Sequence, residues 1–237
     1  MHLLFSRISH PAPLNPNTDT VHQKPGDGDR VTDPIRNIIF DFGNVICNID
    51  VRITENRFVE MGFKIDDPDY PASASKRLFE ELEAGKLTPA QFRDSLRPFF
   101  DQPVSDREID DAWNALLLDI PRERIDMLEK IRNNYRIFML TNTNQIHYLQ
   151  YVQTFRKQTG YDDFDGLFEK AYYSYRIGLQ KPDPEIFRYV LNDSHLLPSE
   201  TLFIDDTLMH VESAHSLGIH AHHLHIGDVH GIMGLFE

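Results

Sequence analysis

The chain has 237 residues, which is enough for one self-sufficient hydrophobic core with a small inserted unit. It carries 24 Lys and Arg against 37 Asp and Glu, and the resulting net charge of −13 argues against nucleic acid as a partner. The single cysteine, Cys47, excludes an intrachain disulfide and fits a reducing cytoplasm. No apolar run approaches the roughly 18 to 20 residues of a membrane-spanning helix. We therefore expect a cytoplasmic protein without a membrane or nucleic-acid partner, either a monomer or a homodimer.

The first part of the chain differs in composition from the rest. Residues 10–33 are rich in Pro, Asn, Thr, Asp and Gly and contain almost no apolar side chains. This composition is typical of a disordered segment, because too little apolar surface can be buried to offset the entropy of ordering the chain. We expect residues 1–33 to form a disordered N-terminal arm without a function of its own.

Short apolar strands then alternate with amphipathic helices. The first predicted strand begins at Ile35 and ends before Asp41, and four more are predicted over residues 135–141, 170–175, 201–205 and 219–225. Helical spacing of apolar residues predicts helices over 121–133, 144–159, 184–192 and 207–217, with Gly218 as a C-cap. Such alternation predicts crossover connections, a parallel sheet and an α/β fold.

One long stretch interrupts this alternation. About 80 residues between the first strand and Pro121 contain no convincing strand, far more than an ordinary connection holds. Two helix starts are recognisable there, Thr88 followed by Pro89 and Ser105 with Glu108 three residues later. We predict an α/β core from residues 34–50 and 121–237, with an inserted helical subdomain over 51–120.

Polar residues that can carry chemistry follow the predicted strands, where parallel sheets bind ligands. They are Asp41 after the first strand, Thr141 and Asn142 after the second, and Asp205 and Asp206 after the fourth. Lys181 precedes Pro182 in the loop before the next helix. Three carboxylates brought together repel one another unless a hard cation lies among them, and Asp oxygens suit Mg²⁺. A hydroxyl, an amide and an ammonium beside that ion would hold a dianionic phosphate.

These residues lie in four ordered motifs, FDFGNV, LTNTN, QKPDPEIF and FIDDTLMHVESAHSLG. With them the chain resembles the haloacid dehalogenase (HAD) superfamily of phosphohydrolases over roughly residues 35–226. It resembles the branch with a small helical cap between the first and second motifs, and it is similar to the α-D-glucose-1-phosphate phosphatases, which also carry a DxGNV motif. The resemblance implies a Rossmann-like parallel sheet core and identifies the predicted helical insert as the cap.

The resemblance also implies a two-step reaction on a small phosphorylated metabolite. Asp41 would attack phosphorus to form an aspartyl-phosphate, which water then hydrolyses. Thr141, the backbone near Asn142 and Lys181 would bind the transferred oxygens, and Lys181 would keep Asp41 ionised. The resemblance implies a Mg²⁺ ion held by the following groups: the Asp41 side chain, the Gly43 carbonyl, Asp205 and Asp206.

One position departs from the commonest family pattern, in which a general acid stands two residues after the nucleophile. Gly43 occupies that position here. A positioned acid contributes about 10² to 10⁴ in rate, so we expect leaving groups that need little protonation, such as glucose 1-phosphate, rather than primary-alcohol phosphates. Two carboxyls are candidates for a substitute acid, Asp50 and the cap residue Glu83, and we also expect Glu83 to contact the substrate.

Two other functions remain as alternatives. A 2-haloacid dehalogenase would attack carbon and need no metal, and the adjacent Asp205 and Asp206 argue against it because a second carboxylate has no use without a cation. A non-catalytic phosphometabolite-binding protein would explain the missing acid at Gly43. Seven histidines lie near the C-terminus: His210, His215, His220, His222, His223, His225 and His230. Strand alternation sends His220 and His222 to one face and His223 and His225 to the other, and we interpret the group as a surface cluster rather than a metal site.

Overall fold

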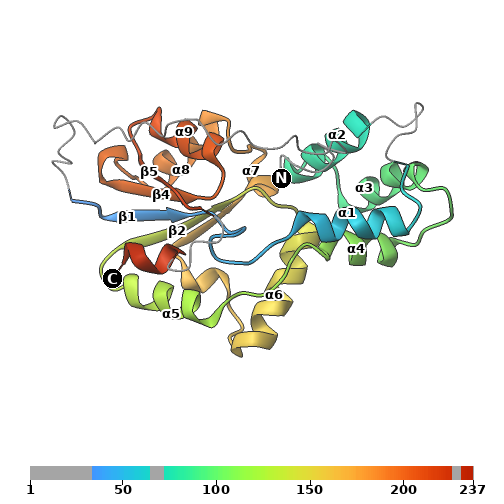
Figure 1. Ribbon diagram of the computed structural model, residues 1–237. Coiled ribbons are helices and arrows are strands. Elements are labelled where there is room, and N and C mark those ends of the chain that lie inside the picture. Colours follow the sequence, from blue (N-terminus) through green and yellow to red (C-terminus); the bar gives the residue numbers. More distant parts are fainter. Residues whose placement is uncertain (1–33, 65–71, 226–230, 237) are drawn as a thin grey trace, which may run out of the picture.

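A parallel β-sheet forms the centre of the molecule in a computed structural model that describes residues 34–64, 72–225 and 231–236 (Figure 1). Five strands lie in the order β3-β2-β1-β4-β5, and every neighbouring pair is parallel. Their bounds are β1 Asn37–Phe40, β2 Arg136–Thr141, β3 Lys170–Tyr173, β4 Thr201–Asp205 and β5 His220–His223. The predicted α/β fold with a Rossmann-like parallel sheet is confirmed. The expected N-terminal arm, residues 1–33, lies outside the described residues.

Helices cover both faces of the sheet, as Figure 1 shows. Because side chains alternate along a strand, Ile38 and Phe40 of β1 point to one face and Ile39 to the other. The first face packs against α5 (Arg122–Ile131) and α6 (Gln145–Thr159), and the second against α8 (Pro184–Asp193) and α9 (Leu208–His215). Short 3₁₀ turns complete the core at Asp165–Leu167, Pro198–Glu200 and Gly231–Leu235.

The third predicted strand is shorter than expected. It ends at Tyr173, and the helical turn α7 (Ser174–Ile177) replaces its predicted last two residues. Ser174 explains the break, because its hydroxyl accepts from the Thr143 N–H at 2.9 Å and donates to the Thr143 carbonyl at 3.0 Å. These bonds take the place of further strand pairing. The C-cap of α9 is Ser216 rather than the predicted Gly218, which lies two residues further on, adopts φ 81° and donates its N–H to the His215 carbonyl at 2.9 Å.

The helices between β1 and β2 have a hydrophobic core of their own. They are α1 (Val51–Glu60), α2 (Ala72–Glu83), α3 (Pro89–Leu96), the 3₁₀ turn Arg97–Phe99 and α4 (Asp106–Asn114). Trp113 is fully buried and stacks on Phe79 and Phe58, with ring centroids 4.7 and 6.1 Å apart. Both expected helix starts are present, and Thr88 as well as Ser105 forms a capping box. We use the name cap for residues 51–120.

The cap packs closely on the core at two places. Trp113 of α4 stacks on His147 of α6, with ring centroids 5.0 Å apart. Gly85, just after α2, adopts φ 68°, and a Cβ atom there would lie 2.1 Å from the Tyr175 carbonyl oxygen. Only glycine allows this close approach, which places the end of α2 beside α7. Among the described helices, none has the length and apolar character needed to cross a membrane.

Candidate active site

The register of the sheet brings the acidic residues of two motifs together. Phe40 pairs with Ile204, and the Asp41 N–H continues this ladder by donating to the Ile204 carbonyl at 2.9 Å. Asp41 therefore directly follows β1, and Asp205 ends the neighbouring β4, at the point where the strand order reverses. One carboxylate oxygen from each of Asp41, Asp205 and Asp206 lies within 4.8 Å of the others, which is close enough for a shared cation.

Lys181 bridges two of these carboxylates. Its ammonium donates to Asp41 Oδ1 and Asp205 Oδ2, both at 2.6 Å, and to the Leu140 carbonyl at 3.0 Å. The residue is only 3 % exposed, so these three acceptors satisfy all its donors away from water. A buried lysine with this arrangement requires both carboxylates, and each carboxylate is stabilised by the lysine.

Burial and charge act in opposite directions on these groups. Burial raises the pKa of Asp41 to about 7, and the Lys181 ammonium only partly opposes it. Lys181 thus acts on the pKa of Asp41 in the expected direction, by lowering it, but does not return it to its ordinary value. Burial also disfavours the charge of Asp205, but Lys181 and His210 hold the pKa of that carboxyl well below its usual range. Although burial acts against it, the two carboxylates keep the pKa of Lys181 above its ordinary value.

Asp206 is held differently from Asp205. Its Oδ2 accepts from the Asn44 amide at 2.9 Å and its Oδ1 from the Thr207 hydroxyl at 3.2 Å, so its hydrogen-bond partners are neutral. Asn44 adopts φ 57°, a left-handed conformation that Asn tolerates, and this turns its side chain toward Asp206. The role of Asn44 was not predicted, although Asn directly after glycine in the first motif is a recognisable turn signal.

His210 is a further residue of the site that sequence reasoning missed. Its Nδ1 lies 3.1 and 3.0 Å from the two oxygens of Asp205, and because an ionised carboxylate only accepts, Nδ1 carries the proton. Burial lowers the pKa of His210, which favours the neutral ring. From the sequence, we grouped His210 with the C-terminal histidines. In the structure it lies on the first turn of α9, five residues after Asp205, and this places its ring beside the carboxylates.

The second motif supports the lysine loop. The Asn142 side chain donates to the Lys181 carbonyl at 2.8 Å and accepts from the Lys181 N–H at 2.9 Å, so two bonds fix the backbone of that loop. Thr141 is buried at the end of β2, and its hydroxyl lies 3.5 Å from the Asn142 carbonyl. The structure thus brings Thr141, Asn142 and Lys181 together at the same sheet edge as the carboxylates.

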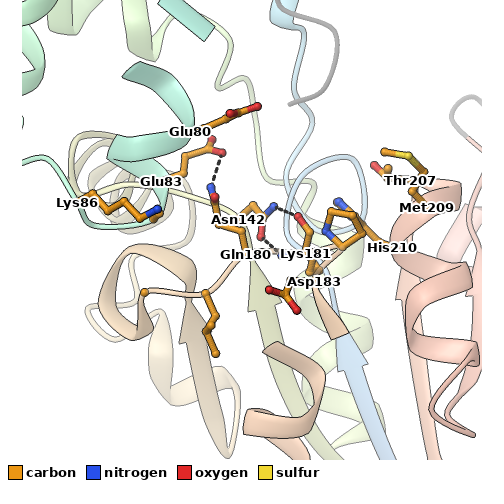
Figure 2. Close-up of a pocket in the computed structure, with 14 residues that line it drawn as sticks. Glu80, Glu83, Lys86, Asn142, Gln180, Lys181, Asp183, Thr207, Met209 and His210 are labelled. Atoms are coloured by element: carbon orange, nitrogen blue, oxygen red, sulfur yellow. Dashed lines mark hydrogen bonds between the residues drawn. The ribbon is translucent and has the colours of Figure 1, made fainter. Parts of the chain in front are cut away.

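A cavity of about 350 Å³ separates this edge from the cap (Figure 2). The cap side is lined by Glu80, Glu83, Ala84 and Lys86, and the core side by Asn142, residues 178–183, Thr207, Met209 and His210. Glu83 is only 5 % exposed, and burial raises the pKa of its carboxyl to about 7. Its Oε2 accepts from Gln180 Nε2 at 3.4 Å. Glu83 thus lies in the cavity wall, and its contact with the substrate stays a prediction.

Asp50, the other candidate for a substitute acid, is not among the residues that line this cavity. It forms the N-cap of α1, where its carboxylate accepts from the Arg52 N–H, and the Arg52 guanidinium binds both of its oxygens at 2.9 and 2.7 Å. Arg52 holds the pKa of Asp50 below its ordinary value. A carboxylate in a surface ion pair cannot hold a proton for the reaction near neutral pH, so Asp50 has a structural role.

The C-terminal histidines form hydrogen bonds with the backbone. His220 Nε2 lies 3.0 Å from the Ser199 carbonyl, and His223 Nε2 lies 3.0 Å from the Asp206 carbonyl. Since a carbonyl only accepts, both nitrogens carry a proton and cannot bind a metal in this state. In the part of the chain that the structure describes, Asp41, Asp205 and Asp206 form the only group of three or more acidic, His or Cys side chains arranged for a metal.

The model of the haloacid dehalogenase-like hydrolase family matches residues 35–218, which include both the core and the cap. The chain belongs to this family. It is therefore a hydrolase, as predicted. D-ribitol-5-phosphate phosphatase from Bacteroides thetaiotaomicron is 32 % identical over 78 % of this chain and 89 % of the relative. Sesquiterpene phosphatase from Aspergillus oryzae is 26 % identical over 78 % of this chain and 88 % of the relative.

A similar fold is found in a HAD family enzyme from Bacteroides thetaiotaomicron whose crystal structure contains magnesium and inorganic phosphate. The two chains share 34 % identity with a TM-score of 0.74, covering 86 % of this chain and all of the other. The expected Mg²⁺ cofactor agrees with that structure and with the acidic cluster described above. The specific resemblance to glucose-1-phosphate phosphatases has no counterpart among these relatives, so the substrate is considered separately below.

Proposed function

We propose that this hydrolase is a Mg²⁺-dependent phosphatase that acts on a small, polyhydroxylated monophosphate, such as a sugar or polyol phosphate, through an aspartyl-phosphate. The observation that carries the proposal is the buried Lys181 ammonium, which lies 2.6 Å from both Asp41 and Asp205 with Asp206 nearby. One cation and three carboxylates grouped at this sheet edge, with Lys181 also lining the cavity, suit a dianion bound together with a divalent metal. A halocarboxylate carries a single negative charge and needs no metal, so it would not require the adjacent carboxylates of Asp205 and Asp206.

In the proposed reaction the Asp41 carboxylate attacks phosphorus and a P–O bond to the leaving group breaks. Mg²⁺, when bound, neutralises charge on the phosphoryl oxygens and allows an anionic nucleophile to approach them. Lys181 keeps Asp41 oriented through Oδ1, which leaves Oδ2 for the reaction. Thr141 and the backbone after it would donate to the transferred oxygens as negative charge develops on them.

The hydrogen bonds of the two adjacent aspartates indicate which of them binds the metal directly. Both oxygens of Asp205 are engaged, by Lys181, by the Thr207 N–H at 2.8 Å and by His210. Asp206 is half-buried and has only neutral partners. We therefore assign Asp41, Asp206 and the Gly43 carbonyl as the direct ligands, with Asp205 acting through the lysine and the histidine.

The lining of the cavity supports the substrate class. The cavity is lined by the apolar side chains of Ala84, Leu179, Pro182 and Met209 and, in larger number, by residues with carboxyl, amide, hydroxyl, ammonium and imidazole groups. Such groups recognise hydroxyls, whereas a long hydrocarbon chain would leave them without partners. A relative named for a polyol phosphate fits this lining better than one named for a sesquiterpene. Glucose 1-phosphate, expected from the sequence, and ribitol 5-phosphate are the first compounds to compare.

The test is phosphate release from a panel of phosphorylated metabolites, measured with Mg²⁺ and with EDTA. We expect metal-dependent turnover that is fastest on sugar and polyol monophosphates and slower on prenyl phosphates. A panel without any Mg²⁺-dependent phosphate release would contradict the proposed function, and halide release from 2-haloacids without metal would favour the dehalogenase instead.

A further inference from the structure

The site lacks an acid at the position two residues after the nucleophile, where Gly43 stands. A primary-alcohol leaving group departs as a strongly basic alkoxide unless a proton reaches its oxygen during P–O cleavage. In an in-line displacement this oxygen faces away from Asp41, toward the cavity and the cap. With no acid at position 43, a cap residue that faces the cavity can reach this oxygen, whereas the side chains that hold Asp41 lie on the core side.

Three carboxyls line the cavity outside the acidic cluster, and only one has the required environment. Glu80 is 55 % exposed and pairs with Lys76, and Asp183 is an exposed N-cap of α8. Glu83 is buried at the end of α2, and Figure 2 shows its carboxyl pointing into the cavity toward Gln180. No cation pairs with Glu83 among the described residues; its hydrogen bond is to the Gln180 amide.

We propose that Glu83 is the proton donor to the leaving-group oxygen, replacing the acid that is missing at Gly43. This inference rests on the proposed phosphatase function. When Asp41 forms its bond to phosphorus and the P–O bond breaks, the Glu83 proton passes to the departing oxygen. In the second step the Glu83 carboxylate takes a proton from the attacking water, inorganic phosphate leaves, and Asp41 and Glu83 return to their starting states.

The Gln180 hydrogen bond orients this proton. An amide N–H donates to Glu83 Oε2 at 3.4 Å, so in the neutral acid Oε2 is the carbonyl oxygen and Oε1 carries the hydrogen. Gln180 directly precedes Lys181, which ties the acid to the same loop that holds the nucleophile. The glycine contact between Gly85 and Tyr175 fixes the adjoining end of α2 on the core.

The protonation state agrees with this role. Burial raises the pKa of Glu83 to about 7, so a large fraction of the carboxyl stays protonated near neutral pH. The charged and titratable groups that share its cavity are Glu80 and Lys86 from the cap and Lys181, Asp183 and His210 from the core. His210 is less suited to the same task, because its Nδ1 proton is held by Asp205.

The experiment compares wild type with Glu83→Gln on phosphates whose leaving groups differ in acidity, in single-turnover measurements with Mg²⁺. Gln keeps the size and the polarity but has no acidic proton. We expect Glu83→Gln to lose about 10²-fold or more on a primary-alcohol phosphate and less than about 10-fold on p-nitrophenyl phosphate, which needs no proton to leave. Retained p-nitrophenyl phosphatase activity also shows that the variant is folded.

Two further variants make the result specific. Glu81→Gln removes a carboxyl from the same helix that pairs with Arg77 outside the cavity, and it should behave as wild type. Glu83→Asp keeps an acid with a shorter reach and should recover part of the loss. In wild type, kcat/KM for the primary-alcohol phosphate should fall as pH rises through about 7, and this falling limb should be absent in Glu83→Gln.

Two results for Glu83→Gln would overturn the inference and leave Glu83 with a binding or structural role. One is an equal loss of rate on all leaving groups, and the other is an unchanged single-turnover rate on primary-alcohol phosphates at saturating substrate. Such results leave the proposed function intact, because wild type still hydrolyses the substrates. By contrast, a wild-type enzyme without Mg²⁺-dependent activity on any phosphate, including the aryl ester, would overturn the proposed function itself.

Discussion

The two sides of the cavity are built in different ways. On the core side, Lys181 bonds to Asp41, Asp205 and the Leu140 carbonyl, and Asp205 also binds Thr207 and His210. On the cap side, the Glu83 side chain has one hydrogen bond within residues 34–64, 72–225 and 231–236, to Gln180, which lies 97 positions away in the sequence. Many hydrogen bonds on the core side hold the reacting groups in the positions that the reaction requires. Fewer hydrogen bonds on the cap side allow that side of the cavity to differ with the substrate. We expect substitutions on the two sides to differ accordingly.

The largest effect is expected for Asp41→Asn, which removes the nucleophilic charge with almost no change in shape. Turnover should fall by about 10³-fold or more, while the protein remains folded because Asp205 still pairs with Lys181. Phosphate release and thermal unfolding measure the two parts of this prediction. Asp50→Asn is the matched control, since Asn also caps helices and Asp50 lies outside the cavity. Substantial Mg²⁺-dependent activity in Asp41→Asn would contradict the mechanism.

A second test removes the cation that joins the core side. In Lys181→Met without metal, Asp41 and Asp205 lose their buried partner, so the free energy of unfolding should fall by about 3 to 5 kcal/mol. Added Mg²⁺ should restore part of this loss, because it supplies positive charge to the same carboxylates. Urea titrations with EDTA and with Mg²⁺ measure both effects.

Lys170→Met provides the comparison for that experiment. Lys170 pairs with Asp193 at 2.5 Å, but both side chains are partly exposed, and such pairs contribute at most about 1 kcal/mol. Equal destabilisation of the two variants, or no response of Lys181→Met to Mg²⁺, would mean that the buried network does not depend on its lysine.

The sequence was a good guide to the core side because parallel strands carry their carboxyl ends to one edge. Asp41, Thr141 and Asp205 each lie at the carboxyl end of a recognisable apolar strand, so their proximity follows from the alternation of strands and helices. His210 and Asn44 were missed because their roles depend on local geometry, the first turn of α9 and a left-handed backbone, that the apolar pattern does not encode.

The cap side was harder to predict. Helix starts and an apolar stripe identified the insert, but they do not determine which residues face the core. Asp50 and Glu83 were equal candidates for an acid in the sequence, and only tertiary packing separates them: Asp50 pairs with Arg52 at the surface, whereas Glu83 is buried beside Gln180. The orientation of an inserted subdomain depends on contacts between distant segments, such as Gly85 with Tyr175.

The burial of Glu83 also predicts a pH-dependent stability. Its pKa is about 7 in the folded protein and 4.5 in an unperturbed side chain, so the folded state retains a proton that the unfolded state releases. The stability of wild type should therefore fall as pH rises from about 4.5 to 7, by up to roughly 3 kcal/mol from this residue. Glu83→Gln has no such loss, and its stability relative to wild type should increase over that window. A constant difference between the two proteins from pH 4.5 to 7.5 would show that Glu83 titrates normally.

The smallest expected effect concerns the boundary between the two sides, at Gly43. A Cβ atom at this position would lie 3.0 Å from Ile49 Cδ1 and 3.9 Å from Asp41 Oδ2. Since Ile49 pairs with Leu117 where the chain enters and leaves the cap, Gly43→Ala should push on that junction and destabilise the protein by about 1 kcal/mol. Ile49→Val removes the Cδ1 atom, so Gly43→Ala should be less harmful in that background. Urea unfolding of both single variants and the double variant measures this coupling, and strict additivity would mean that Ile49 does not restrict position 43. If the coupling is found, Ile49 occupies the space that an acidic side chain at position 43 would need. This would explain in physical terms why this chain has its acid on the cap.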